Sequence, residues 1–224
     1  MLTRFSRAVL AGCILVAHLA MPALAATTAA PMPGDIRTVT SDAPAGDYVL
    51  DKPHASLLFR VSHLGFSHFT GHFARFDATL EFDPKHPTLS QVEATVDPAS
   101  LESDNPPAGF LEMLRGKDWL DAGQFPRMSF RSTSITLSGP NSARILGEFT
   151  LHGVTKPVAL DAVFNGGYVG NKYDRRARIG FSAHGSLKRS DFGIVAGIPA
   201  PGSNFGVGDD VEIVLECEFS GPPR

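Results

Sequence analysis

Cysteine, tryptophan and tyrosine are scarce in this sequence, and neither sign of charge dominates. The 224 residues include 2 cysteines, 1 tryptophan and 3 tyrosines. If Cys13 is lost with the amino-terminal segment described below, Cys217 is alone and no disulfide can form within the chain. The formal net charge is −3, so no excess of basic residues favours nucleic acid or an anionic membrane as a partner. We therefore expect apolar packing to stabilise the fold.

The sequence also lacks the common motifs of hydrolases and metalloenzymes. No G-x-S-x-G, H-E-x-x-H or C-x-x-C occurs, and "GFSHF" (65–69) has phenylalanine where the first motif needs its second glycine. The glycine-rich segment "GSNFGVG" (202–208) does not have the spacing of a phosphate-binding loop. We therefore predict no catalytic residues, no resident cofactor and a protein that is not an enzyme.

The first 25 residues have the pattern of a secretory signal. Arg4 and Arg7 precede the apolar run "AVLAGCILVAHLA", and "ALA" ending at Ala25 is a small-residue cleavage site. The apolar run is too short to cross a bilayer. We predict cleavage after Ala25 and a periplasmic protein. The box "LAGC" leaves a lipid-modified Cys13 as an alternative, which is disfavoured because the apolar run continues beyond the cysteine.

Composition divides the rest of the chain into a leader and one domain. Residues 26–46 are small, polar and proline-bearing, with no periodicity, which is typical of a flexible leader. Residues 47–220 are enough for one domain with a sizeable core. We find no internal repeat and predict no second domain.

Apolar and polar residues alternate through most of this domain. In "HFARFDATLEF" (72–82), every second residue, from His72 to Phe82, falls on one largely apolar face. The same period of two recurs at 57–62, 144–152, 176–188 and 211–219. Such alternation predicts long strands with one buried face. Turn signals such as "DPKHP" and "NGG" separate the strands, so we predict an antiparallel all-β barrel, a fold that removes exposed sheet edges.

Only one segment has a helical pattern. The stretch "PPAGFLEMLRGKDWLDAG" (106–123) has apolar residues at Phe110, Leu111 and Leu114, and Gly116 is a stop signal. We predict one short helix within this range.

The apolar faces of the strands predict the barrel interior. Small residues on them (Ala74, Ala78, Gly147, Ala177 and Ala183) would leave space along the axis, unless neighbouring phenylalanine rings fill it. The chain has 16 phenylalanines, which suit an alkyl or isoprenyl chain better than a sugar. We therefore predict a lipid-binding cavity. Its predicted lining is Phe59, Val61, Phe76, Ala78, Leu80, Phe149, Ile179, Phe181, Ala183, Ile213 and Leu215.

Three histidines lie close together in the sequence, at His63, His68 and His72. A metal-dependent or hydrolytic enzyme using this region is the alternative to a binding protein. The spacing H-x4-H-x3-H lies across a turn and not on one helical face, so we predict no metal site. The period of two places His63 and His72 at strand ends, where they would border the mouth of the cavity.

Four blocks in order carry a resemblance to a known family. They are "YVLDKPHASLLFRVSHLGFSHFTGHFARFDATLEFDP", "LRGKDWLDAGQFPRMSFRS", "GEFTLHGVTKPVAL" and "KRSDFGI". Together they resemble the YceI-like family of secreted bacterial proteins. The resemblance implies an eight-stranded lipocalin-like barrel that binds polyisoprenoids or other long-chain lipids in the periplasm. It does not imply catalysis.

The resemblance also suggests where a ligand headgroup and partners would lie. It makes Arg189, Asp191 and Phe192 of "KRSDFG" an expected feature of the entrance, with a strand-capping ion pair as the alternative. The sequence departs from the family at "DWL" (118–120) and at the long connection "GIPAPGSNFGVGD" (197–209), so the resemblance does not imply the length or the shape of the ligand. The expected partner is a hydrophobic small molecule. Transient contact with a membrane or a membrane redox protein, and a dimer, are left open.

Overall fold

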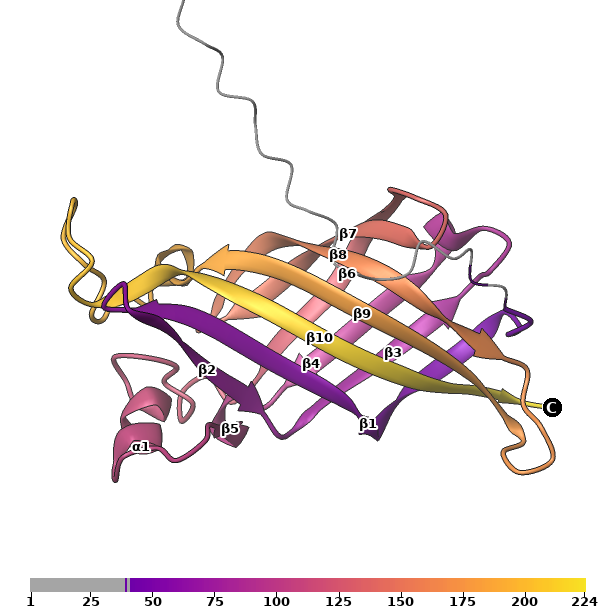
Figure 1. The fold of residues 1–224 in the computed structure, drawn as a ribbon, viewed down its shortest axis with the longest axis horizontal. Helices are drawn as coiled ribbons and strands as arrows, with labels where there is room; N and C mark the ends of the chain where they lie inside the picture. Colours follow the sequence, from indigo (N-terminus) through magenta and orange to yellow (C-terminus); the bar gives the residue numbers. More distant parts are fainter. Residues whose placement is uncertain (1–38, 40) are drawn as a thin grey trace, which may run out of the picture. The chain divides into compact units, whose positions relative to one another are not determined.

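The computed structural model describes residue 39 and residues 41–224, which form a barrel of antiparallel strands (Figure 1). The predicted signal and most of the leader lie outside the described residues. The strands are β1 (Gly46–His63), β2 (Ser67–Phe73), β3 (Phe76–Phe82), β4 (Gln91–Val96), β5 (Leu101–Glu102), β6 (Met128–Leu137), β7 (Ser142–Leu151), β8 (Val154–Tyr168), β9 (Arg176–Lys188) and β10 (Val207–Pro223). The helices are α1 (Phe110–Arg115) and three 3-10 turns, η1 (Pro87–Leu89), η2 (Pro98–Ser100) and η3 (Arg189–Phe192). Among these residues, no helix has the length and apolar character needed to span a membrane.

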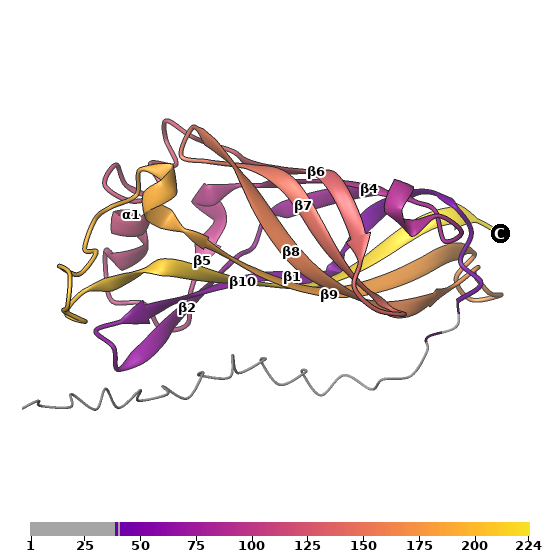
Figure 2. The same cartoon turned by 90° about the horizontal axis from the view of Figure 1, so that it is seen from above.

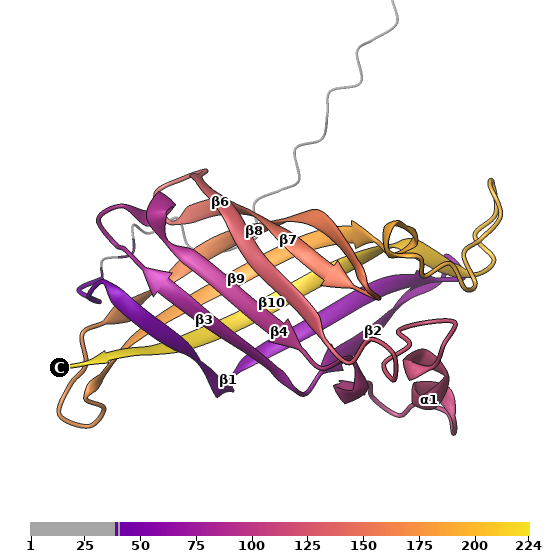
Figure 3. The ribbon, with the colours of Figure 1, turned by 180° about the vertical axis from the view of Figure 1, so that it is seen from behind.

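Eight of the strands close the barrel. The order β10-β9-β8-β7-β6-β4-β3-β1 is closed by antiparallel pairing of β1 with β10, and β2 and β5 extend the sheet beyond the end of β1. β1, β9 and β10 lie nearest the viewer in Figure 1, and β3, β4 and β6 lie nearest in Figure 3. The predicted eight-stranded all-β barrel is therefore confirmed.

Along one of its edges, β1 pairs with two different strands. Its first residues, Gly46–Val49, pair with β3, and its last residues, Leu58–His63, pair with β2. On the opposite edge, the pairing with β10 shifts between Leu50 and Ala55, so the chain bulges over residues 51–54. In the described structure, the stretch 50–57 has no strand partner on the side of β2 and β3.

The chain changes partners again between β2 and β3, and this corrects one prediction. The backbone N–H groups of Ala74 and Arg75 donate to the carbonyl and the hydroxyl of Ser100, each at 3.0 Å. Phe73 is buried and Ala74 is exposed, so the alternation changes phase at this point. The prediction of a single face from 72 to 82 was therefore wrong for its first residues.

The helix is shorter than the segment that predicted it. α1 has six residues and follows Gly109, whose φ of 77° is in the left-handed region favoured by glycine. Gly116 ends the helix by donating its N–H to the Met113 carbonyl. In the turns that follow, Leu120 and Ala122 donate to carbonyls of the helix. Figure 2 shows α1 at the end of the barrel opposite to the carboxyl terminus.

Two apolar clusters pack the ends of the barrel. The first includes Tyr48, Ile179 and Phe219, and its member Ala43 shows that the end of the predicted leader packs on the barrel. Tyr48 has no exposed surface, and its hydroxyl donates to the Pro44 carbonyl at 2.8 Å. The second cluster joins α1, η3 and the neighbouring strands. The space between the clusters contains the candidate site.

Candidate ligand-binding cavity

The barrel encloses a cavity of about 1270 Å³ that is lined by residues of all eight closing strands. Pockets for drug-sized ligands usually measure roughly 300–1,000 Å³, so this cavity is large enough for a long chain. Its wall is mostly apolar. From one end, at the β3–β4 and β6–β7 turns, the lining continues to α1 and η3 at the other.

Most of the predicted lining residues face this cavity, because the strands keep the inward and outward alternation of their sequences. All of the predicted residues except Ile179 line the cavity: Phe59, Val61, Phe76, Ala78, Leu80, Phe149, Phe181, Ala183, Ile213 and Leu215. β9 and β10 illustrate this, since Ala183 pairs with Leu215 in register and both side chains line the interior.

Aromatic rings form part of the wall and do not fill the interior. Near one end, the centroid of the Phe164 ring lies 5.3 Å from that of Phe181 and 5.9 Å from that of Phe82. Near α1, the rings of Phe69 and Phe110 meet edge to face at 5.4 Å. Ring pairs at these separations attract one another, so they hold the ends of the cavity in a defined shape.

The space inside comes only in part from the small residues that were predicted. Ala78 and Ala183 line the cavity, but Ala74 is exposed and Ala177 is fully buried outside it. Gly147 leaves no space, because a Cβ there would lie 2.3 Å from the Phe130 ring. Three further alanines line the cavity and were missed: Ala94, Ala143 and Ala162. Period-two alternation in "QVEATV" and "VALDAVF" was the signal that could have found two of them.

Two predicted apolar residues belong to the packed ends and do not border the cavity. Ile179 has 1% of its surface exposed and packs in the cluster of Tyr48 and Phe219, which fill that part of the interior. Phe192, also 1% exposed, packs its ring against that of Phe149 with a centroid distance of 5.7 Å. The prediction that Ile179 lines the cavity was wrong, because alternation identifies the inward face but not how densely it is packed. Phe192, expected at the entrance from the resemblance, is packed inside this end of the barrel and does not border the cavity.

The three histidines are not brought to one point. His63 and His68 are exposed and border the cavity near the β1–β2 turn. His72 points away from the cavity, and its Nε2 lies 3.2 Å from a carboxylate oxygen of Glu102. The placement of His72 at the mouth was therefore wrong, as a consequence of the phase change after β2. Since His72 lies apart from His63 and His68, the three histidines do not form the set of ligands that a metal-dependent enzyme in this region would need.

The segment "KRSDFG" has one residue at the cavity. Arg189 lines it and has 4% of its surface exposed. Asp191 is exposed on η3 and does not line the cavity, because the turn carries it to the outer side. No ion pair joins these two residues among those described, so the alternative of a strand-capping pair is not found, and of the two only Arg189 lies at the cavity.

Cys217 carries a free thiol and lies in this apolar wall. It lines the cavity from the middle of β10. Burial, with a smaller contribution from the charge of Glu216, raises the pKa of its thiol to about 12. A thiol of such high pKa remains protonated at neutral pH and is a poor nucleophile.

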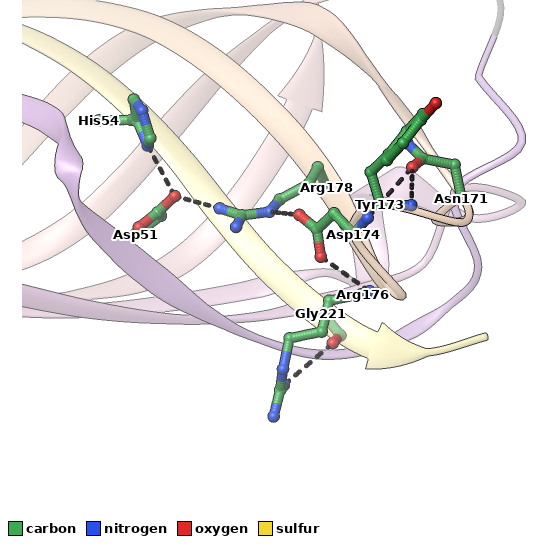
Figure 4. A network of polar contacts seen from close by, with 8 residues as sticks. All are labelled: Asp51, His54, Asn171, Tyr173, Asp174, Arg176, Arg178 and Gly221. Atoms are coloured by element: carbon green, nitrogen blue, oxygen red, sulfur yellow. Dashed lines mark hydrogen bonds and ion pairs between the residues drawn. The ribbon is translucent and has the colours of Figure 1, made fainter.

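A polar network lies on the outer face of the barrel, away from the cavity (Figure 4). Arg178 donates to the carboxylates of Asp51 and Asp174, and Nδ1 of His54 lies 2.8 Å from Asp51. The hydrogen bond with His54 and the Arg178 charge lower the pKa of Asp51, and Asp51 raises the pKa of His54. Ligand atoms of Asp51, His54 and Glu218 lie within 4.8 Å of one another, as in a metal site. The Asp51 carboxylate is already paired with the Arg178 guanidinium, so the arrangement favours an ion-pair network over a metal site.

The geometry therefore defines a small closed antiparallel barrel with a ligand-sized apolar interior. The chain belongs to the YceI-like family, since the family model described as the YceI-like domain matches residues 48–219.

Similar proteins occur in several bacteria. The chain is 35% identical over 187 residues to a UPF0312 protein of Yersinia pestis, covering 83% of this chain and 92% of the relative. It is 38% identical over 152 residues to a UPF0312 protein of Pseudomonas savastanoi, covering 67% and 77% of the two chains.

Solved structures share the fold. The Campylobacter jejuni YCEI protein matches with a TM-score of 0.61 and 27% identity, over 72% of this chain and 90% of that one. Burkholderia cenocepacia BcnA matches with a TM-score of 0.63 and 24% identity, over 75% and 98%. A polyisoprenoid binding domain from Saccharophagus degradans matches with a TM-score of 0.55 and 11% identity, over 78% and 98%.

Proposed function

We propose that this protein binds a long-chain amphiphile, such as a polyisoprenoid, a quinone-like lipid or a fatty-acyl chain, inside its barrel. The observation that carries this proposal is the continuous apolar cavity of about 1270 Å³. Burial of an alkyl chain contributes about 0.8 kcal/mol per methylene, so ten methylenes would contribute roughly 8 kcal/mol before ordering costs. The name of the structurally similar polyisoprenoid binding domain is consistent with such a ligand.

The proposal is for a binding protein and not for an enzyme. The cavity wall offers a protonated thiol, Cys217, and no base in contact with it among the described residues. The exposed His63 and His68 lie at its rim, and neither has an acidic partner in the described structure. Shielding an apolar chain from water needs only the wall that the strands provide.

We further propose that the protein works in the periplasm, after removal of the signal at 1–25. Amino-terminal sequencing of the protein from a periplasmic extract is expected to start at Ala26. A chain that starts at a diacylated Cys13 and fractionates with membranes would overturn this part of the proposal.

Native mass spectrometry of the protein purified from its own periplasm tests the binding itself. The expected spectrum shows one lipid-sized adduct per chain. Organic extraction should remove this adduct, and addition of farnesol or dodecanoate should then give an adduct with the mass of the added compound. The proposed function would be refuted if the purified protein carries no adduct and, after extraction, binds neither farnesol nor dodecanoate.

A further inference from the structure

A buried guanidinium borders the cavity near α1. Arg189 follows β9 in η3, has 4% of its surface exposed and lines the cavity. Its Nε and one terminal nitrogen donate to the carbonyls of Gly208 and Val207, both at 2.8 Å. The other terminal nitrogen donates to the Ile194 carbonyl at 3.2 Å. Arg189 thus ties the connection before β10 to the end of the barrel.

This charge has no carboxylate in contact with it among the described residues. The charge of Asp209 favours the charged form of Arg189, but its carboxylate accepts hydrogen bonds from the N–H and hydroxyl of Ser190, at 2.9 and 2.8 Å. The Trp119 ring covers the guanidinium, with its centroid 5.1 Å from the central carbon. Burial lowers the pKa of Arg189, which is the expected response of a cation removed from water. A buried charge of this kind is costly unless an opposite charge compensates it.

The structural role of Arg189 uses only part of its hydrogen-bonding capacity. A guanidinium has five N–H donors, and three of them are used by the carbonyls described above. The described part of the chain provides no acceptor for the other two. A second polar group at this end is also unsatisfied, since the Ser103 hydroxyl is buried, lines the cavity and has no partner there. Buried polar groups normally have partners, so both point to a group that the protein itself does not supply.

We propose that the ligand carries an acidic head, a carboxylate or a phosphate, whose oxygens accept hydrogen bonds from the free N–H groups of Arg189. The tail then extends along the apolar wall toward Phe82 and Phe164 at the far end of the cavity. This inference rests on the proposed lipid binding and adds the charge and the orientation of the ligand. Charge-assisted hydrogen bonds in a site of low dielectric are strong, so the head is expected to select among lipids with equal tails.

Three compounds with the same tail test the inference: dodecan-1-ol, dodecanoate and dodecyl phosphate. Their Kd values are measured on the full-length mature protein at pH 8 by displacement of a fluorescent probe. At least one of the two anions is expected to bind tenfold or more tightly than the alcohol, and the better anion identifies the head. The preference is expected to persist in 0.5 M NaCl, because salt screens a buried pair weakly.

Arg189→Met is expected to lose the preference for the anion, so that the ratio of the Kd values for the alcohol and the better anion falls to within about twofold of one. Lys188→Met is the matched control, since this neighbouring cation is exposed and pairs with Asp210 at 3.1 Å. Equal binding of all three compounds by the wild type would show that Arg189 is only a structural clamp, and this holds even if Arg189→Met fails to fold. Failure of the wild type to bind any of the three would instead refute the proposed function, and the inference with it.

Discussion

Ala183→Trp tests whether the barrel interior is the binding site. Ala183 lies within β9, and its neighbours in register, Ala162 on β8 and Leu215 on β10, also line the cavity. An indole ring at this point would cross the interior. If it removes about five methylenes of a ligand from the wall, at ~0.8 kcal/mol each, binding weakens by about 4 kcal/mol, roughly a thousandfold in Kd. Because the ring enters free space, the free energy of unfolding should fall by no more than about 1–3 kcal/mol.

Ser182→Trp is the matched control on the same strand. The Ser182 hydroxyl donates to a Glu216 carboxylate oxygen at 2.6 Å and accepts from the Asn165 amide at 2.8 Å, on the outer face. An indole there leaves the cavity unchanged, so the Kd for dodecanoate should stay within about twofold of the wild type, whereas Ala183→Trp should lose binding. Urea titrations establish that both variants fold. Equal affinity of the wild type and a folded Ala183→Trp variant would refute the reasoning.

Three further predictions concern stability. The pKa of Cys217 is raised to about 12 from 9.0, so its contribution to folding is complete below pH 9 and is lost as pH rises. Relative to Cys217→Ala, the free energy of unfolding should therefore fall by about 1.4 kcal/mol per pH unit between pH 9 and 12; a constant difference in urea titrations would contradict this. Gly147→Ala should lower the free energy of unfolding by about 1–3 kcal/mol, because the new methyl group meets the Phe130 ring; an unchanged urea midpoint would count against this. Tyr48→Phe should cost about 0.5–1.5 kcal/mol through the lost bond to Pro44 and leave the Kd for dodecanoate unchanged, which the same two assays measure.

The alternation of apolar and polar residues was sufficient to predict the barrel and most of its lining. It succeeded along β9 and β10, where Phe181 and Ile213 line the cavity as predicted, because both strands keep their partners over their length. It failed after His72, where the chain leaves β1 and bonds to Ser100, 25 residues beyond Arg75. An alternating sequence contains no sign of such a change, because both segments alternate and only their phase differs.

The sequence also could not predict how the interior is divided between packing and space. Ile179 and Phe181 share one face of β9, yet only Phe181 borders the cavity, because residues from other strands cover Ile179. The burial of Arg189, a polar residue, could not be predicted from the sequence either. The sequence led us to expect Arg189 at the entrance or in a strand-capping ion pair, but not its burial, which depends on carbonyls that lie 5 to 19 residues away in the chain.

We expect the four-residue bulge of β1 to hinder the addition of a strand from another chain. Along residues 50–57, the backbone edge that faces β2 and β3 has no partner strand in the described structure. Such an edge is a template to which a second chain can add a strand. Pro53 has no N–H to offer to an incoming strand. Beside it, the charged Lys52 pairs with Asp77 across the opening at 2.7 Å, so an added strand would have to displace this ion pair. The bulge therefore places residues that resist aggregation along this unpaired stretch of the barrel wall.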